Sequence, residues 1–204
     1  MVGADIMFSP GVKDMYPEKY RTFVTVEGLS GKLCGKFRPG HFRGVATVVL
    51  KLLNMVQPDR AYFGWKDAQQ LIIIKKMVKD LEIPVEIIGL PTVRESDGLA
   101  MSSRHRFLSP EERKAAPLLY QSLLRVKSAL RDGKNIKEVL KDGRGFLKKN
   151  PAIKLQYLKA VDLQTLENVG EGLRSLPKEV LIALAAFIGS TRLIDNIICR
   201  VPPL

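Results

Sequence analysis

Short and long apolar segments alternate in the first half of the chain, and this alternation restricts the possible folds most strongly. Residues 20–26, 61–64 and 85–90 are short and rich in β-branched or aromatic side chains, which is typical of strands. Residues 45–56 and 67–81 are longer and repeat their apolar side chains at helical spacing. The order strand, helix, strand, helix, strand predicts a parallel sheet with helices on its faces.

Residues 2–10 are expected to add a further short strand, which would end at Pro10. In parallel sheets of this kind, ligands bind beyond the carboxyl ends of the strands. The loops at those ends are predicted to be 64–70 and 92–104.

The second half has a different pattern and predicts a small α+β unit. It is expected to contain a helix from Ser109 toward Leu130, a helix over 136–149, strands over 155–163 and 180–188, and a last apolar segment over 193–201. We therefore place a domain boundary near Pro91, which divides the chain into residues 1–91 and 92–204.

Composition excludes several classes of protein. The chain has 204 residues, enough for one or two domains with a sizeable core. Its longest apolar run, 180–189, is far shorter than the ~18 residues of a membrane span, so no membrane association is expected. Cys34 and Cys199 lack metal-ligand spacing, so we interpret both as thiols in a reducing cytoplasm.

The chain is basic, with 33 Lys and Arg against 21 Asp and Glu, a net charge of +12. Such an excess can indicate nucleic-acid binding, a phosphorylated ligand or only a solvated basic surface. The lysines are spread along the chain rather than clustered, which disfavours a nucleic-acid partner.

The loop after residues 61–64 is the first candidate site. Gly64 allows a ligand to approach the backbone closely, and Lys66 offers a positive charge at a helix N-terminus. Asp67 is expected either to cap that helix or to accept a hydrogen bond from a ribose hydroxyl, and Gln70 lies one turn further on. A plain turn with a capping Asp and a solvated Lys remains an equal alternative.

Two other loops carry polar residues that could bind an anion. Ser102, Ser103 and Arg104 suit a phosphate chain, although an ordinary polar loop with a capping Ser explains them as well. Arg38 and His41 lie between glycines and suit either an anion or a subunit contact. Neither histidine has an acid or cysteine at metal spacing, so no protein-bound metal site is predicted.

Taken in order, these segments resemble the pantothenate synthetase (pantoate–beta-alanine ligase) family. The matching motifs are Arg-Pro-Gly-His-Phe-Arg-Gly-Val at 38–45, Phe-Gly-x-Lys-Asp-x-Gln-Gln at 63–70, Asp-Gly-Leu-Ala-x-Ser-Ser-Arg at 97–104 and Leu-Ile-Asp-Asn at 193–196. The resemblance implies an α/β fold, with a partial Rossmann-like nucleotide-binding domain over 1–91 and an α+β domain over 92–204. It also implies a homodimer.

The resemblance implies a ligase that uses ATP and Mg²⁺ as well as pantoate and beta-alanine. The pantoate carboxylate would attack the α-phosphorus of ATP, giving pantoyl adenylate and pyrophosphate. The beta-alanine amine would then attack the adenylate carbonyl, giving pantothenate and AMP.

The resemblance also assigns roles to single residues. Gln70 would bind pantoate, and Arg38 and His41 would support substrate access or the dimer contact. Those implied for ATP are Gly64, Trp65, Lys66, Asp67, Val93, Met101, Ser102, Ser103 and Arg104. Of these, Lys66, Ser102, Ser103 and Arg104 would also be catalytic.

Three departures from the family pattern qualify these expectations. The chain lacks the N-terminal part that carries a His-x-Gly-His motif, so we interpret it as a truncated version. Trp65 stands where a polar residue is expected and could narrow the nucleotide pocket, and Cys34 stands where Glu is expected. A catalytically inactive remnant, with dimer contacts and weak nucleotide binding, is therefore the alternative to an active ligase, and marginal stability is expected.

Overall fold

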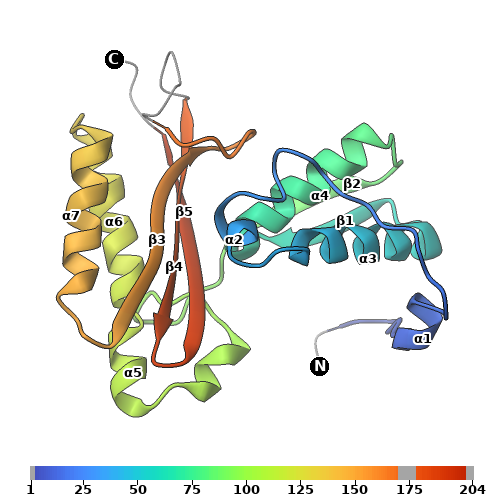
Figure 1. Ribbon diagram of the computed structural model, residues 1–204, viewed down its shortest axis with the longest axis horizontal. Coiled ribbons are helices and arrows are strands. Elements are labelled where there is room, and N and C mark those ends of the chain that lie inside the picture. The colour runs from blue at the N-terminus through green and yellow to red at the C-terminus, as the bar shows by residue number, and fades with distance from the viewer. Residues whose placement is uncertain (1–2, 170–177, 201–204) are drawn as a thin grey trace.

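A computed structural model describes residues 3–169 and 178–200. A three-stranded sheet stands between two groups of helices (Figure 1). The helices of the second half cover one side of this sheet, and the whole first half lies on the other side.

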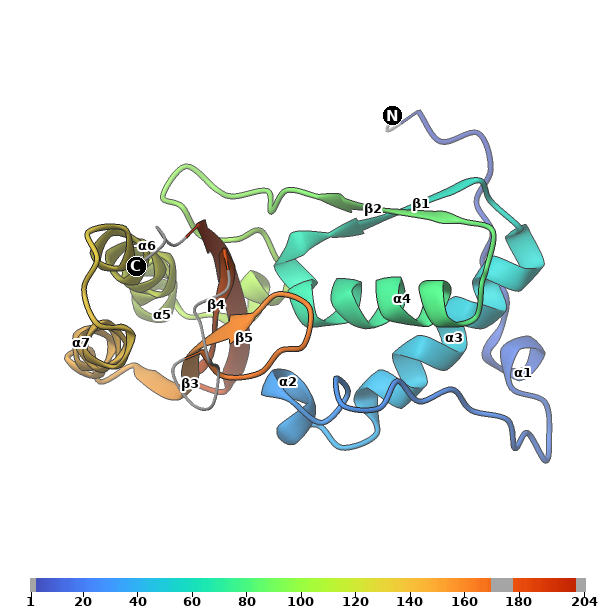
Figure 2. The ribbon, with the colours of Figure 1, turned by 90° about the horizontal axis from the view of Figure 1, so that it is seen from above.

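The first half is built around two parallel strands, β1 (Arg60–Gly64) and β2 (Glu86–Leu90), which pair in register from Arg60 with Glu86 to Gly64 with Leu90. The connecting helix α4 (Ala68–Asp80) follows a short 3₁₀ turn η1 (Trp65–Asp67) and buries one apolar face. Helix α3 (His41–Val56) packs against α4. Figure 2 shows the order sheet, α4, α3 from above.

Helix α3 begins four residues before the predicted start at Val45, directly after Gly40. Gly40 has φ = 77°, a left-handed conformation that glycine adopts without steric cost. Two further short helices precede it, α1 (Val12–Met15) and α2 (Leu33–Lys36).

The strands predicted over 2–10 and 20–26 are wrong for the described residues. Residues 3–10 pair with no strand, and Ile6 and Met7 are almost fully exposed. Residues 20–26 form neither a helix nor a strand, and Val24 donates its backbone N–H to the Thr47 hydroxyl (2.9 Å) instead of to a strand. Local composition favours an extended backbone, whereas a strand also needs a neighbour for its hydrogen bonds.

The second half contains helices α5 (Pro110–Ala115), α6 (Leu118–Arg131) and α7 (Ile136–Lys148), with a 3₁₀ turn η2 (Ser103–Phe107) before them. The helix start predicted at Ser109 is confirmed, because Ser109 and Glu112 form a capping box. The single helix predicted toward Leu130 is wrong: Pro117 divides it into α5 and α6. Proline has no N–H to donate, and its ring crowds the preceding turn.

The three strands β3 (Ile153–Asp162), β4 (Glu179–Ile188) and β5 (Thr191–Arg200) form an antiparallel sheet in the order β3-β4-β5. They confirm the strands predicted over 155–163 and 180–188, and they make the apolar segment from Leu193 onward a strand; Val201 lies outside the described residues. No helix among the described residues is long and apolar enough to cross a membrane.

The central strand β4 belongs to two hydrophobic cores, because its side chains alternate between the faces of the sheet. Val180, Ile182 and Leu184 pack with the helices of the second half. Leu181 and Ala183 pack instead with side chains of α3 and α4. The division of the chain near Pro91 stays a prediction, and the sheet is common to both cores.

The two glycines of α7 provide a test of this packing. Gly145 is exposed with open space around a built Cβ, whereas a Cβ on Gly143 would lie 2.7 Å from Val126 and 2.8 Å from Leu158. We expect Gly145→Ala to stabilise the protein by about 0.5–1 kcal/mol, since alanine is the better helix former. Gly143→Ala should destabilise it by about 1–3 kcal/mol through overpacking. Urea denaturation measures both, and equal shifts would contradict this account of the α6–α7 contact.

Candidate active site

The turn between β1 and α4 carries the first group of candidate residues. Asp67 occupies the N-cap position of α4 but makes no side-chain capping bond, so its carboxylate remains available to a ligand. Burial is the main cause that lowers the pKa of Lys66 below its ordinary value. Arg104 acts in the same direction, and Asp67 and Asp195 oppose the shift. Lys66 is thus a half-buried cation in a setting that favours an anionic ligand.

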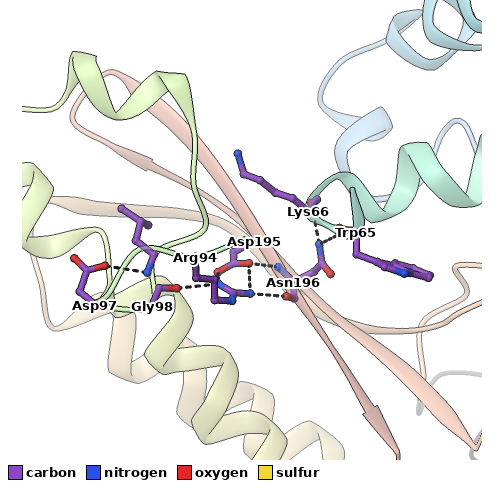
Figure 3. Close-up of polar contacts among 8 residues, drawn as sticks. Trp65, Lys66, Arg94, Asp97, Gly98, Asp195 and Asn196 are labelled. Atoms are coloured by element: carbon purple, nitrogen blue, oxygen red, sulfur yellow. Dashed lines mark hydrogen bonds and ion pairs between the residues drawn. The ribbon is translucent and has the colours of Figure 1, made fainter. Parts of the chain in front are cut away.

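Strand β5 holds this turn in place through Asn196. The Asn196 amide donates hydrogen bonds to the backbone carbonyls of Trp65 and Lys66, both at 2.9 Å (Figure 3). The preceding residue, Asp195, accepts two hydrogen bonds from Arg94, at 2.8 and 3.0 Å. Burial raises the pKa of Asp195, and the Arg94 guanidinium opposes that shift. Residues far apart in sequence therefore fix the position of Lys66.

Residues 93–101 form a tight antiparallel turn that leads into η2. Arg94 bridges to Ala100, and Gly98 adopts φ = 90° at the tip, where a Cβ would lie 2.6 Å from the Tyr120 ring. The Arg94 guanidinium lies 3.6 Å from the centre of that ring and donates to the Gly98 carbonyl. This loop and β5 share one ion pair, so the loop is anchored where it meets the sheet.

The Ser102–Arg104 turn rests on β5. The Ser102 hydroxyl accepts a hydrogen bond from the Arg104 backbone N–H (3.3 Å), so Ser102 caps η2 as the structural alternative predicted. The Arg104 guanidinium donates to the backbone carbonyl of Arg192 (3.2 Å). Both side chains line a cavity, so the capping role and a ligand-binding role are compatible.

Arg38 lines this cavity too, and Arg38 and His41 together line a second cavity that shares residues with it. Arg38 Nη1 lies 2.8 Å from His41 Nε2. Burial is the largest cause that lowers the pKa of His41, and the guanidinium groups of Arg38, Arg192 and Arg104 add to the effect. His41 is therefore biased toward its neutral form by surrounding positive charge.

Two adjoining cavities collect most of the predicted residues. One, of about 50 Å³, is lined by polar side chains that include Arg38, His41, Lys66, Asp67, Gln70 and Arg192. The other, of about 170 Å³, is lined by Arg38, Lys66, Asp67, Ser102, Arg104 and Arg192, among others. The cavities lie between the first half and the β3–β5 sheet. Their shared lining carries three cations, Arg38, Lys66 and Arg192, against the carboxylates of Asp67 and Asp195.

Five predicted residues line neither cavity: Gly64, Trp65, Val93, Met101 and Ser103. The Trp65 ring points away from the Lys66 side chain (Figure 3) and packs over Gly89, where a built Cβ would lie 2.6 Å from the indole nitrogen. Trp65 therefore does not narrow either cavity.

Sequence reasoning missed Arg94 and Arg192. Arg192 precedes the Leu-Ile-Asp-Asn motif, and the motif was the available signal. No local signal pointed to Arg94, because its ion-pair partner, Asp195, lies 101 positions away in the sequence.

Comparisons with known proteins match almost the whole chain. A family model described as pantoate-beta-alanine ligase matches residues 1–198. The chain belongs to the pantoate–beta-alanine ligase family. A pantothenate synthetase of Acetivibrio thermocellus is 54% identical over 203 residues, which cover 98% of this chain and 70% of the relative.

Solved structures of the family agree with the fold. The crystal structure of pantothenate synthetase from Thermus thermophilus has a TM-score of 0.88 and 46% identity, and covers 96% of this chain and 70% of that one. The Francisella tularensis pantoate-beta-alanine ligase, complexed with beta-gamma ATP and beta-alanine, has a TM-score of 0.66 and 35% identity over 91% of this chain and 61% of that one.

The buried ion pair between Arg94 and Asp195 predicts that two acid-to-alanine substitutions differ strongly in their effect on the free energy of unfolding. Asp195 and Arg94 have side chains only 2% and 18% exposed, whereas Glu86 and Arg60 form a surface pair with both side chains more than 60% exposed. Asp195→Ala should lower the free energy of unfolding by about 3–5 kcal/mol, because it leaves a buried guanidinium unpaired. Glu86→Ala should change it by less than about 1 kcal/mol. Denaturant titration compares the two, and similar losses would contradict the role given to the buried pair.

The ion pairs behind the 93–101 turn predict a pH dependence. Hydrogen bonds from the Arg113 guanidinium are the largest cause that lowers the pKa values of Glu95 and Asp97. A lowered folded-state pKa stabilises the protein above the unfolded pKa, and this stabilisation disappears as pH falls through the folded value. Arg113→Ala should therefore cost stability at pH 7, and the difference from wild type should shrink below about pH 4. Arg106→Ala, at an exposed position, serves as the control in thermal melts across pH.

Proposed function

We propose that this chain is a ligase that condenses pantoate with beta-alanine at the expense of ATP, through a pantoyl-adenylate intermediate. One observation supports the proposal beyond family membership: Lys66, Asp67, Gln70, Ser102 and Arg104 line two adjoining cavities. Residues from two segments that are distant in sequence, the β1–α4 turn and the loop that leads into η2, thus line adjoining space.

The cations that line the cavities fit the first step. When the pantoate carboxylate attacks the α-phosphorus, the bond to the β-phosphate breaks and charge grows on the departing pyrophosphate. Lys66, Arg104 and the Ser102 hydroxyl are proposed to bind these phosphate oxygens, since preorganised cations and donors stabilise charge that develops in a transition state. Gln70 is proposed to hold pantoate in line for the attack.

The second step forms a C–N bond. The neutral amine of beta-alanine attacks the acyl carbon, the bond to the AMP phosphate breaks, and the nitrogen loses a proton. Holding the amine next to the adenylate makes the reaction effectively unimolecular.

The metal is proposed to enter with the nucleotide. Within residues 3–169 and 178–200, no group of three or more His, Cys, Asp or Glu side chains could hold a metal ion. Mg²⁺ commonly binds through substrate phosphates with few protein ligands. These residues therefore fit a nucleotide that carries Mg²⁺, which would neutralise phosphate charge. Asp67 is proposed to lie near the ribose.

The remaining expectations from the sequence are kept as proposals. They are ATP contacts by Gly64, Trp65, Val93, Met101 and Ser103, a homodimer, and a cytoplasmic location. An inactive remnant is not favoured, because the homologues carry the name of the ligase and the matched loops converge.

Pyrophosphate release by the purified chain tests the function directly. With ATP, Mg²⁺ and pantoate we expect release that depends on pantoate, and AMP with pantothenate when beta-alanine is added. Lys66→Ala should lower kcat/KM about 100- to 1000-fold, because one donor to the developing charge is lost. Lys79→Ala, an exposed lysine at the end of α4, should leave it unchanged.

Two results would contradict the proposal at different points. No pantoate-dependent release from the folded wild type would overturn the ligase function. Release by Lys66→Ala at the wild-type rate would leave the function standing and remove Lys66 from the catalytic residues.

A further inference from the structure

Arg192 occupies the junction between the two cavities. It lies at the start of β5, opposite Phe187 of β4, and it lines both cavities although its side chain is half-buried. No motif predicted a role for it, and the proposed mechanism does not use it.

A β-bulge in the neighbouring sheet determines where the Arg192 side chain points. Leu155 pairs with Ala186 and Tyr157 pairs with Ala185, so Gln156 is an extra residue in β3 without a partner on β4. The Gln156 side-chain oxygen accepts two hydrogen bonds from Arg192, from Nε at 3.0 Å and from Nη2 at 2.9 Å. Bulges re-aim side chains near functional sites, and this one supplies the acceptor that orients the guanidinium.

In the part of the chain that the structure describes, the Arg192 guanidinium has one other side-chain contact, with Cys34. Arg192 Nη2 lies 3.4 Å from the Cys34 sulfur, which in turn lies 3.1 Å from the Tyr157 hydroxyl. Burial raises the pKa of Tyr157 above its ordinary value, so this hydroxyl stays protonated. Among the described residues, Nη1 of Arg192 has no hydrogen-bond partner and the guanidinium has no ion pair.

This arrangement differs from that of an arginine that serves stability alone. Arg200, on the same strand, is exposed and forms an ion pair with Glu179 at 3.1 Å. Arg192 is less exposed, yet its partners orient the charge without neutralising it. A partly buried charge is favourable only when an opposite charge compensates it.

We propose that Arg192 is a further substrate-binding residue, which binds a carboxylate or phosphate oxygen where the two cavities meet, and that Gln156 is the residue that positions it. The inference rests on the proposed function for the identity of the anion. Arg38 lines the same two cavities and also lacks an ion pair among the described residues, so a second guanidinium is available to an anion there.

Calorimetric titration of the purified chain tests the binding role, with pantoate, beta-alanine and inorganic pyrophosphate as separate probes. Arg192→Gln should raise Kd about 10- to 100-fold for at least one probe, because a charge-assisted hydrogen bond is lost. The probe that is affected identifies the anion as a carboxylate or a phosphate. Arg200→Gln is the matched control on the same strand and should leave all three Kd values unchanged.

Two substitutions at Gln156 separate positioning from a structural role. Gln156→Leu removes the acceptor and should weaken binding of the same probe. Gln156→Glu keeps the acceptor but pairs the guanidinium with a carboxylate, so it should weaken binding at least as much while preserving or raising the melting temperature. A merely structural role predicts that Gln156→Glu binds as the wild type does.

The inference is overturned if Arg192→Gln binds all three probes as the wild type does, or if the folded wild type binds none. Pyrophosphate release by the wild type is measured separately. If the wild type is active and Arg192→Gln binds the probes unchanged, only this inference is contradicted. If the wild type is inactive, the proposed function is contradicted.

Discussion

The buried ion pair between Arg94 and Asp195 is the interaction on which the candidate site depends. Taking two charges out of water is costly, and the cost is offset only when every hydrogen-bonding group is used. Here the carboxylate accepts both Arg94 bonds and the Asn196 backbone N–H, at 2.8 Å. Because Asn196 also holds the carbonyls of Trp65 and Lys66, the same short segment of β5 positions both candidate loops.

The β3–β5 sheet makes this arrangement possible. One face of β4 packs on α6 and α7, and the other packs on the first half of the chain. Its strands therefore form a rigid wall at the boundary between the two halves, where binding sites commonly lie. Residues of β5 enter the cavities from that wall, while Lys66, Ser102 and Arg104 enter from loops.

The cavities gather more positive charge than the chain neutralises. Burial and neighbouring guanidinium groups lower the pKa of His41, and burial lowers that of Lys66. A binding site can tolerate repulsion among its own positive charges when an anionic ligand relieves it. Composition alone did not show what the net charge of +12 is for. Part of it lies in these cavities, whose cations suit carboxylates and phosphates.

The sequence by itself determined the elements with local signals. Helical periodicity identified α3 and α4, the capping residues identified the start of α5, and the ordered motifs identified the family. The same motifs predicted loops of which several residues line the two cavities. Tertiary structure alone decided whether extended segments became strands, because pairing needs a partner that composition does not reveal. It also decided that the Trp65 ring faces Gly89, that Gln156 bonds to Arg192, and that Arg94 pairs with the distant Asp195. The direction of a side chain and its contacts with distant residues depend on tertiary packing. The spacing of residues along the sequence does not determine that packing.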